Sequence, residues 1–154
     1  MASNLQAELK QTRPFRNLEH EAHLSIQRTA AVLEHAFEAA LKPYGITATQ
    51  YNVLRILRGA DGGLCRSEVR ERMLRPVPDV TRLLDRLEEL DLIVRERGGD
   101  DRRFVTTKIT RTGLTVLEGL DPVADEIHER QLGHLDQSAL RSLIELLARV
   151  RNRE

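Results

Sequence analysis

Residues 80–110 constrain the fold of this 154-residue chain more than any other segment, because a helix pattern, a turn and two strand patterns follow one another without interruption. The helix pattern comes first. Its apolar residues recur at the three- and four-residue spacing of one helical face: Val80, Leu83, Leu84, Leu87 and Leu90. Its other face is polar and charged. The segment therefore begins with an amphipathic helix, one face of which must pack against a core.

A predicted β-hairpin follows this helix. Residues 92–97 are typical of a short strand, residues 98–101 of a turn, and residues 104–109 of a second strand. In the second strand apolar and polar residues alternate, which indicates a sheet with one covered face. Arg102 and Arg103 fall at or beside the tip of the hairpin.

Several short motifs in this segment, taken together, resemble the signature of the MarR (multiple-antibiotic-resistance regulator) family of bacterial transcription factors. They are Leu-Asp-Arg-Leu-Glu at 84–88, Arg95 to Arg97, Asp101-Arg102-Arg103, and Ile109-Thr110 with Gly113. Each motif is common, but the ordered set is specific. One departure is Asp91, which stands where the family usually has Gly. An Asp adopts the left-handed turn conformation at modest cost.

The resemblance covers nearly the whole chain and implies a fold. We expect a mainly α protein with a small β-hairpin wing, in which a winged helix-turn-helix is flanked by N- and C-terminal dimerisation helices. The expected divisions are residues 1–45 for the N-terminal dimerisation region, 46–110 for the DNA-binding domain and 111–154 for the C-terminal dimerisation helices. The implied function is a sequence-specific regulator of double-stranded DNA, a ligand-responsive repressor that binds a pseudo-palindromic operator as a homodimer.

Helix signals on both sides of the segment agree with this arrangement. A long helix is predicted over 18–41, a capping box at Thr47 and Gln50 starts the next, and a short helix covers 66–74. Pro78 is expected in the first turn of the recognition helix, where a missing amide costs no helical hydrogen bond.

The chain after the hairpin predicts further helices. Thr110 can cap the first, and Pro122 is expected to kink or restart it with Asp121 as the new cap, because an interior proline costs about 3 kcal/mol. Asp136 starts the last helix, which carries an apolar stripe from Leu140 to Val150. Apolar stripes at both ends of the chain need a partner, which favours a homodimer.

The N-terminal part of the recognition helix is expected to enter the major groove, where side chains reach base edges. Arg82 is the candidate for a bidentate guanine contact, whereas Thr81 and Arg86 are placed for phosphates. The alternative is that both arginines are solvated and pair with carboxylates on their own helix. The candidate DNA contacts of this region are Val77, Pro78, Asp79, Thr81, Arg82 and Arg86.

The wing supplies the other candidate DNA contacts. Arg103 matches the family's wing-tip arginine, which a narrow minor groove attracts, and Asp101 matches the carboxylate that holds it. Arg102 lies between them. The alternative is a surface turn with a weak ion pair. Arg95 and Arg97 either support the wing or touch phosphates.

Composition narrows the class of partner. The chain has 24 basic and 24 acidic residues, so a nonspecific nucleic-acid coat is disfavoured, although arginines are dense between 66 and 111. Aromatic residues make up 3% and Trp is absent, which leaves few platforms for unpaired bases and favours duplex DNA. No apolar run reaches membrane-spanning length and no signal segment is evident, so a cytoplasmic location without membrane partners is the expectation.

The resemblance also implies an effector pocket between the dimerisation helices and the winged domain, for a small aromatic or amphipathic molecule that shifts the population away from the DNA-binding state. The candidate lining residues are His35, Phe37, Tyr44 and Tyr51, with simple core packing as the alternative.

Three other classes remain for comparison. A reactive thiol at Cys65 would make the protein a redox-responsive regulator. However, Cys65 does not lie where the family's peroxide sensors carry their reactive thiol, so a structural role is favoured. A winged-helix interaction module without DNA binding is the second alternative. An enzyme is not expected, since phosphate loops and nucleophile constellations are missing. No cofactor is expected, and His20 with His23 lacks further ligands for a metal.

Overall fold

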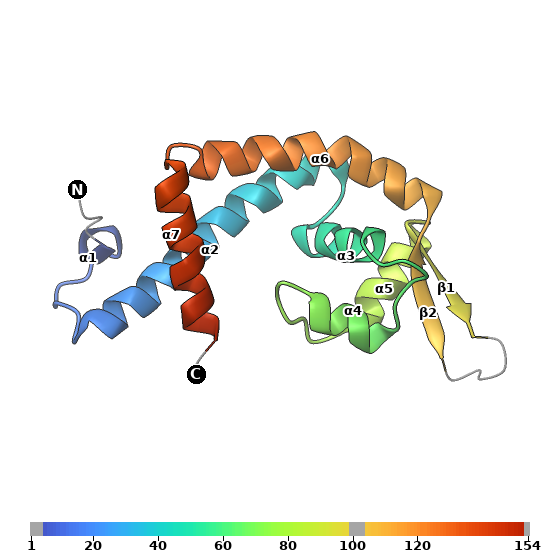
Figure 1. Cartoon of the computed structure of the whole chain (residues 1–154), viewed down its shortest axis with the longest axis horizontal. Helices are drawn as coiled ribbons and strands as arrows, with labels where there is room; N and C mark the ends of the chain where they lie inside the picture. The colour runs from blue at the N-terminus through green and yellow to red at the C-terminus, as the bar shows by residue number, and fades with distance from the viewer. Residues whose placement is uncertain (1–4, 99–103, 153–154) are drawn as a thin grey trace.

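The structure is a computed structural model and describes residues 5–98 and 104–152 (Figure 1). It is mainly helical with one antiparallel hairpin, as the sequence predicts. In chain order the elements are α1 (Leu5–Glu8), α2 (Leu18–Leu41), the 3-10 helix η1 (Lys42–Tyr44), α3 (Ala48–Arg58), α4 (Arg66–Arg72), α5 (Val80–Glu89), β1 (Ile93–Arg97), β2 (Val105–Ile109), α6 (Arg111–Leu132) and α7 (Gln137–Arg151).

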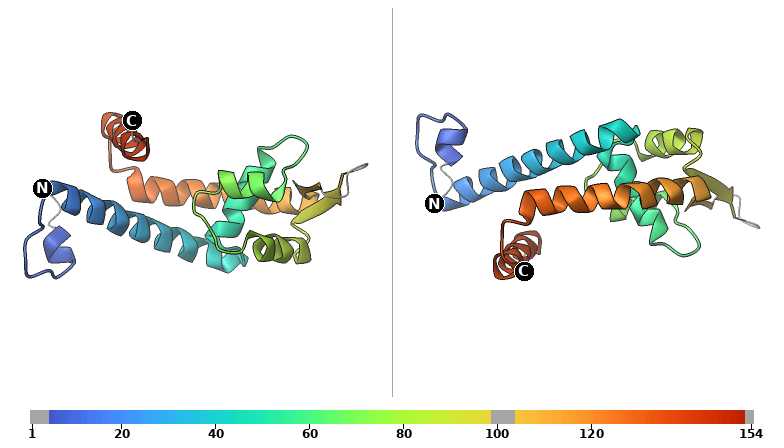
Figure 2. Two further views of the ribbon diagram at one scale, coloured as in Figure 1. Left: turned by 90° about the horizontal axis from the view of Figure 1, so that it is seen from below. Right: turned by 90° about the horizontal axis from the view of Figure 1, so that it is seen from above.

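Two long helices give the molecule its elongated shape. α2 and α6 run side by side, as both views of Figure 2 show, and α3, α4, α5 and the hairpin gather at one end of the pair. α7 leaves the opposite end of α6 at a steep angle and stands away from the hairpin (Figure 1). The compact end and the extended helical end therefore present separate surfaces.

The core lies in the compact end and fixes α5 in place. Leu54 of α3, Val69 of α4 and Leu84 of α5 are almost completely buried against one another, and α6 adds Leu117 and Leu120. Each such side chain contributes about 1.5–3 kcal/mol through burial. Helices as short as these are not stable in isolation, so packing against the core stabilises them.

Polar caps start the main helices at the predicted places. Thr47 and Gln50 form the expected capping box, with reciprocal backbone hydrogen bonds of 3.1 and 3.0 Å. Thr110 caps α6 and Asp136 caps α7. The expectation for Pro78 was wrong, because Asp79 is the N-cap of α5 and Pro78 precedes it. A cap requires a side-chain acceptor, which proline lacks.

α6 runs through Pro122 without a restart, so the predicted new helix start at Asp121 is wrong. Asp121 does not cap a new helix. It accepts hydrogen bonds from both terminal nitrogens of Arg58, at 2.7 and 3.1 Å. Pro122 and Glu118 lie on the exposed side of α6, where water can satisfy the carbonyl that proline leaves without a donor. The helix therefore tolerates its proline.

The hairpin is anchored at its base. Ile93 pairs with Ile109 and Arg97 with Val105, so the strands are in register from one end to the other. Leu64 adds a bridge to buried Thr107 through hydrogen bonds of 2.9 and 2.7 Å. Before β1, Asp91 adopts a φ of 59°, the left-handed turn conformation that the sequence predicts.

Two boundaries differ slightly from the predicted ones. The helix predicted over 66–74 ends at Arg72, because Met73 turns to an extended conformation that starts the segment leading to α5. β2 begins at Val105, so Phe104 lies outside the strand and is largely exposed.

Candidate nucleic-acid interface and effector pocket

α5 has one face in the core and one in solvent. Val80, Leu84 and Leu87 are buried, whereas the exposed face carries Thr81 and Arg82 in the first turn. The core therefore fixes which side chains α5 presents outward.

The side chain of Arg82 has fewer partners than that of Arg86 on this face. Its backbone N–H donates to the Asp79 carboxylate at 2.9 Å, which leaves the side chain free of the cap. Within the part of the chain that the structure describes, no hydrogen bond or ion pair engages its guanidinium. Arg86 differs, since it pairs with Glu89 at 3.1 Å. The alternative of pairing with a carboxylate on the same helix thus applies to Arg86 and not to Arg82.

The other candidate residues around the start of α5 have different environments. The Thr81 hydroxyl accepts a hydrogen bond of 2.9 Å from Arg66 at the start of α4, so a second arginine lies beside the exposed face. Val77 is half-buried and packs against the core. Pro78 and Asp79 are exposed. Five of the six candidates thus reach the surface, and Val77 has mainly a packing role.

The wing-tip candidates Asp101, Arg102 and Arg103 lie outside the described residues. The structure does show what orients the wing. Arg95 of β1 donates to Glu88 of α5 at 3.0 Å and pairs with Asp85 at 2.6 Å. The hydrogen bond to Arg95 lowers the pKa of Glu88, which keeps that carboxylate charged. Arg95 was expected either to support the wing or to touch phosphates, and in the structure its contacts with α5 support the wing.

A cavity of about 480 Å³ lies between the long helices and the winged domain. α2, α3 and α6 contribute to its walls, and the segment between α4 and α5 contributes residues 73–75. Its described lining comprises Ala30, Leu33, Glu34, Phe37, Ala48, Thr49, Tyr51, Asn52, Arg55, Met73, Leu74, Arg75, His128, Gln131 and Leu132. This position matches the effector pocket that the family resemblance implies.

Three aromatic rings that line this cavity contact one another. Phe37 stacks on His128 with the ring centres 5.7 Å apart and the planes 9° from parallel. Tyr51 meets Phe37 edge-on at 5.4 Å. Arg55 approaches the Tyr51 ring to 6.0 Å, and burial raises the pKa of the Tyr51 hydroxyl. Aromatic rings favour stacked or edge-on contacts with other rings, so this cluster suits an aromatic ligand.

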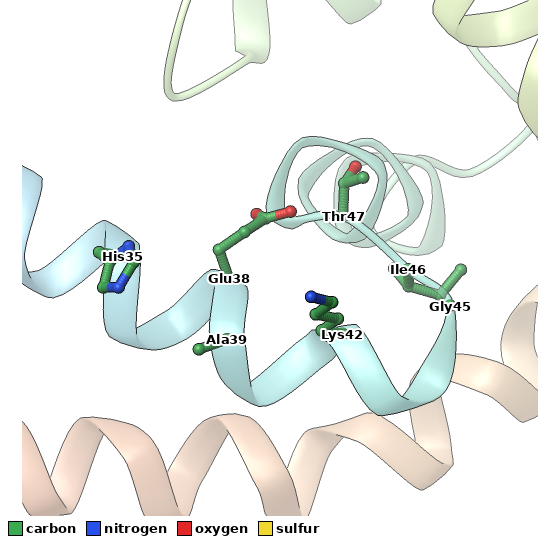
Figure 3. Close-up of a pocket in the computed structure, with 7 residues that line it drawn as sticks. All are labelled: His35, Glu38, Ala39, Lys42, Gly45, Ile46 and Thr47. Carbon is green, nitrogen blue, oxygen red and sulfur yellow. The ribbon is translucent and has the colours of Figure 1, made fainter.

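His35 and Tyr44 do not share that cavity. His35 is exposed and lines a separate open hollow of about 450 Å³, shown in Figure 3 with Glu38, Lys42 and Thr47. Glu38 there accepts a hydrogen bond of 2.7 Å from the Ala48 N–H, so it helps to cap α3. Tyr44 is 54% exposed and lines neither cavity. Only Phe37 and Tyr51 of the four candidates come together.

Cys65 has a structural position. It is the N-cap residue of α4, its N–H donates to Glu68 at 2.7 Å, and its sulfur lies 3.0 Å from the Ser67 hydroxyl. Among the described residues, no group of three or more His, Cys, Asp or Glu side chains could hold a metal ion. No described helix is long and apolar enough to cross a membrane.

Sequence reasoning missed Arg55, Arg75 and His128 as lining residues of the cavity. They come from three segments that are far apart in the chain, and no motif connects them. A weak signal existed for Arg75, since it lies directly before the proline-rich approach to the recognition helix.

The compact core, the exposed face of α5 and the anchored hairpin define a winged helix-turn-helix protein. Comparisons with known proteins agree. The model of the MarR family matches residues 44–103. A MarR transcription factor from Planctomyces limnophilus is 36% identical, with 88% of this chain and 98% of that chain covered and a TM-score of 0.67.

Two further relatives bear on function. The structure of a MarR mutant from Escherichia coli in complex with operator DNA is 25% identical, covers 87% of this chain and 98% of that chain, and has a TM-score of 0.77. The transcriptional repressor MdtR of Bacillus subtilis is 28% identical, with 84% of this chain and 83% of that protein covered. The chain belongs to the MarR family and is a DNA-binding transcription regulator, not an enzyme.

Proposed function

We propose that this chain is a ligand-responsive repressor that reads a pseudo-palindromic operator as a homodimer. The observation that carries the DNA contact is the exposed start of α5, where the Arg82 guanidinium has no hydrogen-bond or ion-pair partner among the described residues while the opposite face is buried in the core. In this proposal Arg82 contacts a guanine edge, and Thr81 and Arg86 contact phosphates.

The wing completes the proposed reader. Arg103, held by Asp101, enters the minor groove and Arg102 lies beside it, as the family resemblance implies. The anchoring of β1 to α5 through Arg95 supports this role, because it couples the orientation of the wing to that of the recognition helix. The proposal includes the expected division of the chain into an N-terminal dimerisation region that ends at residue 45, a DNA-binding domain that ends at residue 110, and C-terminal dimerisation helices.

The MarR family is dimeric, and apolar side chains at the helical end of this chain support the same assembly. Ile144, Leu146 and Val150 of α7 and Val32 of α2 are each more than half exposed. Burying such side chains between two copies is favourable, and pairing two recognition helices about one DNA turn apart matches a palindrome. A regulator of this kind acts on bacterial DNA, so we place the protein in the cytoplasm.

The effector part of the proposal rests on the cavity beside Phe37 and Tyr51. BpsR of Bordetella bronchiseptica, a neighbour in fold at 22% identity and a TM-score of 0.77, has its DNA binding regulated by 6-hydroxynicotinic acid. The aromatic rings that line the present cavity favour an aromatic or amphipathic effector.

Fluorescence anisotropy with the duplex upstream of the protein's own gene tests the DNA-binding proposal. We expect tight binding at low salt that weakens steeply as salt rises, because phosphate contacts release counterions. Arg103→Ala should abolish specific binding while circular dichroism shows an intact fold. If Arg103→Ala binds with unchanged affinity, Arg103 is not a DNA contact. If the wild type shows no specific binding, a winged-helix interaction module is favoured.

A further inference from the structure

One arginine outside the recognition helix contacts the exposed face of α5. Arg66 is the first residue of α4, and its Nη1 donates a hydrogen bond of 2.9 Å to the Thr81 hydroxyl in the first turn of α5. Both residues are exposed. The contact therefore joins the two helices of the helix-turn-helix at the surface that the proposed function assigns to DNA.

The charge of Arg66 is not neutralised by a neighbouring carboxylate. Among the described residues its side chain bonds to the uncharged Thr81 hydroxyl, and no ion pair engages it. Glu68, two residues later, accepts a hydrogen bond of 2.7 Å from the Cys65 N–H. Arg66 therefore presents its positive charge to solvent beside Thr81.

The position of Arg66 does not favour the stability of α4. A cation in the first turn of a helix lies near the positive end of the helix dipole, where an acidic residue is more favourable. A hydrogen bond between two exposed side chains offsets little of this cost, because water competes for both groups. An anion that binds at this surface is a better explanation of the arginine.

Arg66 and Thr81 together have the donors that one phosphate group requires. A guanidinium carries several N–H donors in a fixed fork, and the hydrogen bond to Thr81 uses one nitrogen of that fork. The Thr81 hydroxyl accepts this bond and keeps its own hydrogen, which it can donate outward. A phosphate in contact with both side chains receives a charge-assisted hydrogen bond from Arg66 and a second hydrogen bond from Thr81.

We propose that Arg66 is a further DNA contact of this regulator and that it binds the same backbone phosphate as Thr81, from the other helix of the pair. The hydrogen bond between the two side chains orients the Thr81 hydroxyl before DNA binds. A phosphate contact fixes the register of α5 in the groove without reading a base. The inference rests on the proposed role of Thr81 and adds a residue of α4 to that phosphate site.

Operator duplexes in which single phosphates are replaced by uncharged methylphosphonates test this assignment by fluorescence anisotropy. Each replacement removes the charge of one phosphate and leaves the bases unchanged. Among the positions where replacement weakens binding of the wild type, one in each half-site should have little effect on Arg66→Gln, and the same one should have little effect on Thr81→Val. If Arg66→Gln is as sensitive as the wild type at every position, or if the two variants lose sensitivity at different phosphates, the proposal is overturned.

Salt titration on the unmodified operator gives a second measurement. Arg66→Gln should weaken binding about tenfold at low salt, because a charge-assisted hydrogen bond is lost. It should also lower the magnitude of the slope of log affinity against log salt by about two, one for each copy in the homodimer. Single-base operator variants should lose the same factor with Arg66→Gln as with the wild type. A change in preference at one base pair would make Arg66 a base contact and overturn the phosphate assignment.

Stability and DNA affinity should respond to Arg66→Gln in different ways. Thermal unfolding should show a variant as stable as the wild type or slightly more stable, because a cation has left the first turn of α4. A loss of stability that accounts for the weaker binding would make the contact with Thr81 purely structural and overturn the proposal.

A matched control lies on α6. Arg130 is an exposed arginine near the end of that helix, far along the chain from the hairpin, and it pairs with Glu126. Arg130→Gln should leave the salt slope and the methylphosphonate pattern unchanged, and losses equal to those of Arg66→Gln would show a general charge effect. If the wild type binds its operator and Arg66→Gln keeps the wild-type pattern, the contact alone is overturned. If the wild type shows no specific binding, the contact and the proposed function are overturned together.

Discussion

At the scale of residues, the arginines of the reader divide into two groups. Arg86 and Arg95 are paired with carboxylates, and Arg95 orients the wing in this way. Arg82 has no such partner in the described part of the chain. A paired guanidinium must give up its partner before it can bind a base, whereas a free one need not. This difference supports the proposal that Arg82, rather than Arg86, reads a base.

Arg82→Ala should lower affinity for the operator by about 1–3 kcal/mol and relax specificity at one base pair, because a bidentate guanine contact is lost. Arg86→Ala should weaken binding to all sequences by a smaller, salt-dependent amount. Anisotropy with single-base operator variants distinguishes the two. A uniform loss across all variants for Arg82→Ala would make it a phosphate contact.

The Arg58–Asp121 ion pair gives a pH-dependent prediction. Hydrogen bonds from Arg58 lower the pKa of Asp121 in the folded state, so its stabilisation is fully present above the ordinary aspartate pKa of about 3.9 and is lost as the pH falls through the lower folded-state value. Asp121→Asn should cost up to about 1 kcal/mol at pH 7 and progressively less in acid.

Urea denaturation of both proteins at pH 7 and near pH 3 measures this difference. The advantage of the wild type over Asp121→Asn should be smaller at the lower pH. An advantage that persists unchanged in acid would mean that the pair does not act through the charge of Asp121.

At the scale of elements, the sequence predicted most of what local patterns control. The amphipathic period of α5, the Thr47 and Asp136 caps and the left-handed Asp91 are confirmed, because each depends on neighbours within a few residues. The continuous α6 was not predicted, since tolerance of Pro122 depends on the solvent exposure of that side of the helix, which the local sequence does not give.

The candidate site shows the same division. Its exposed α5 residues follow from helical period, but the cavity brings together α2, α3, α6 and the 73–75 segment. Phe37 and Tyr51 were predicted to line an effector pocket, with core packing as the alternative; both line the same cavity, and Tyr51 is also part of the core. Arg55, Arg75 and His128 come from α3, the segment before α5 and α6, and their position beside one cavity depends on tertiary packing that local sequence does not encode.

Gly113 provides a test of how α6 packs on the base of the hairpin. A Cβ there would collide with the Leu92 carbonyl oxygen and lie 2.7 Å from Cγ1 of Ile109. Gly113→Ala should therefore destabilise the protein by about 1–3 kcal/mol, the usual cost of overpacking.

Gly119 on the same helix is the control, because a Cβ there meets no atom of the described structure within 4 Å. Gly119→Ala should leave stability unchanged or raise it by up to about 1 kcal/mol through helix propensity. Thermal unfolding of both variants gives the comparison. Equal behaviour would contradict the close contact at Gly113.

At the scale of the whole molecule, zero net charge is compatible with DNA binding because the carboxylates have local roles. Asp79 caps α5, and Asp85 and Glu88 hold Arg95. Two winged helix-turn-helix domains must also be paired in the homodimer, and the exposed apolar side chains of α7 provide a surface for this pairing.

Ile144 is 65% exposed in the single chain, so its burial is expected only in the dimer. Ile144→Glu should shift the protein to monomer and weaken operator binding, since a charge in an apolar interface is costly. Sedimentation velocity measures the assembly, with Arg141→Glu on the same helix as a control for added negative charge. A dimer of unchanged stability would place Ile144 outside the interface.

Hydroxyl-radical footprinting of the wild-type protein on the duplex upstream of its own gene tests the central claim most directly. Paired recognition helices predict two symmetric protected patches centred about one helical turn, or 10 base pairs, apart. Arg82→Ala should lose both patches together. A single unpaired patch, or protection that does not depend on sequence, would contradict a homodimeric reader of a pseudo-palindromic operator.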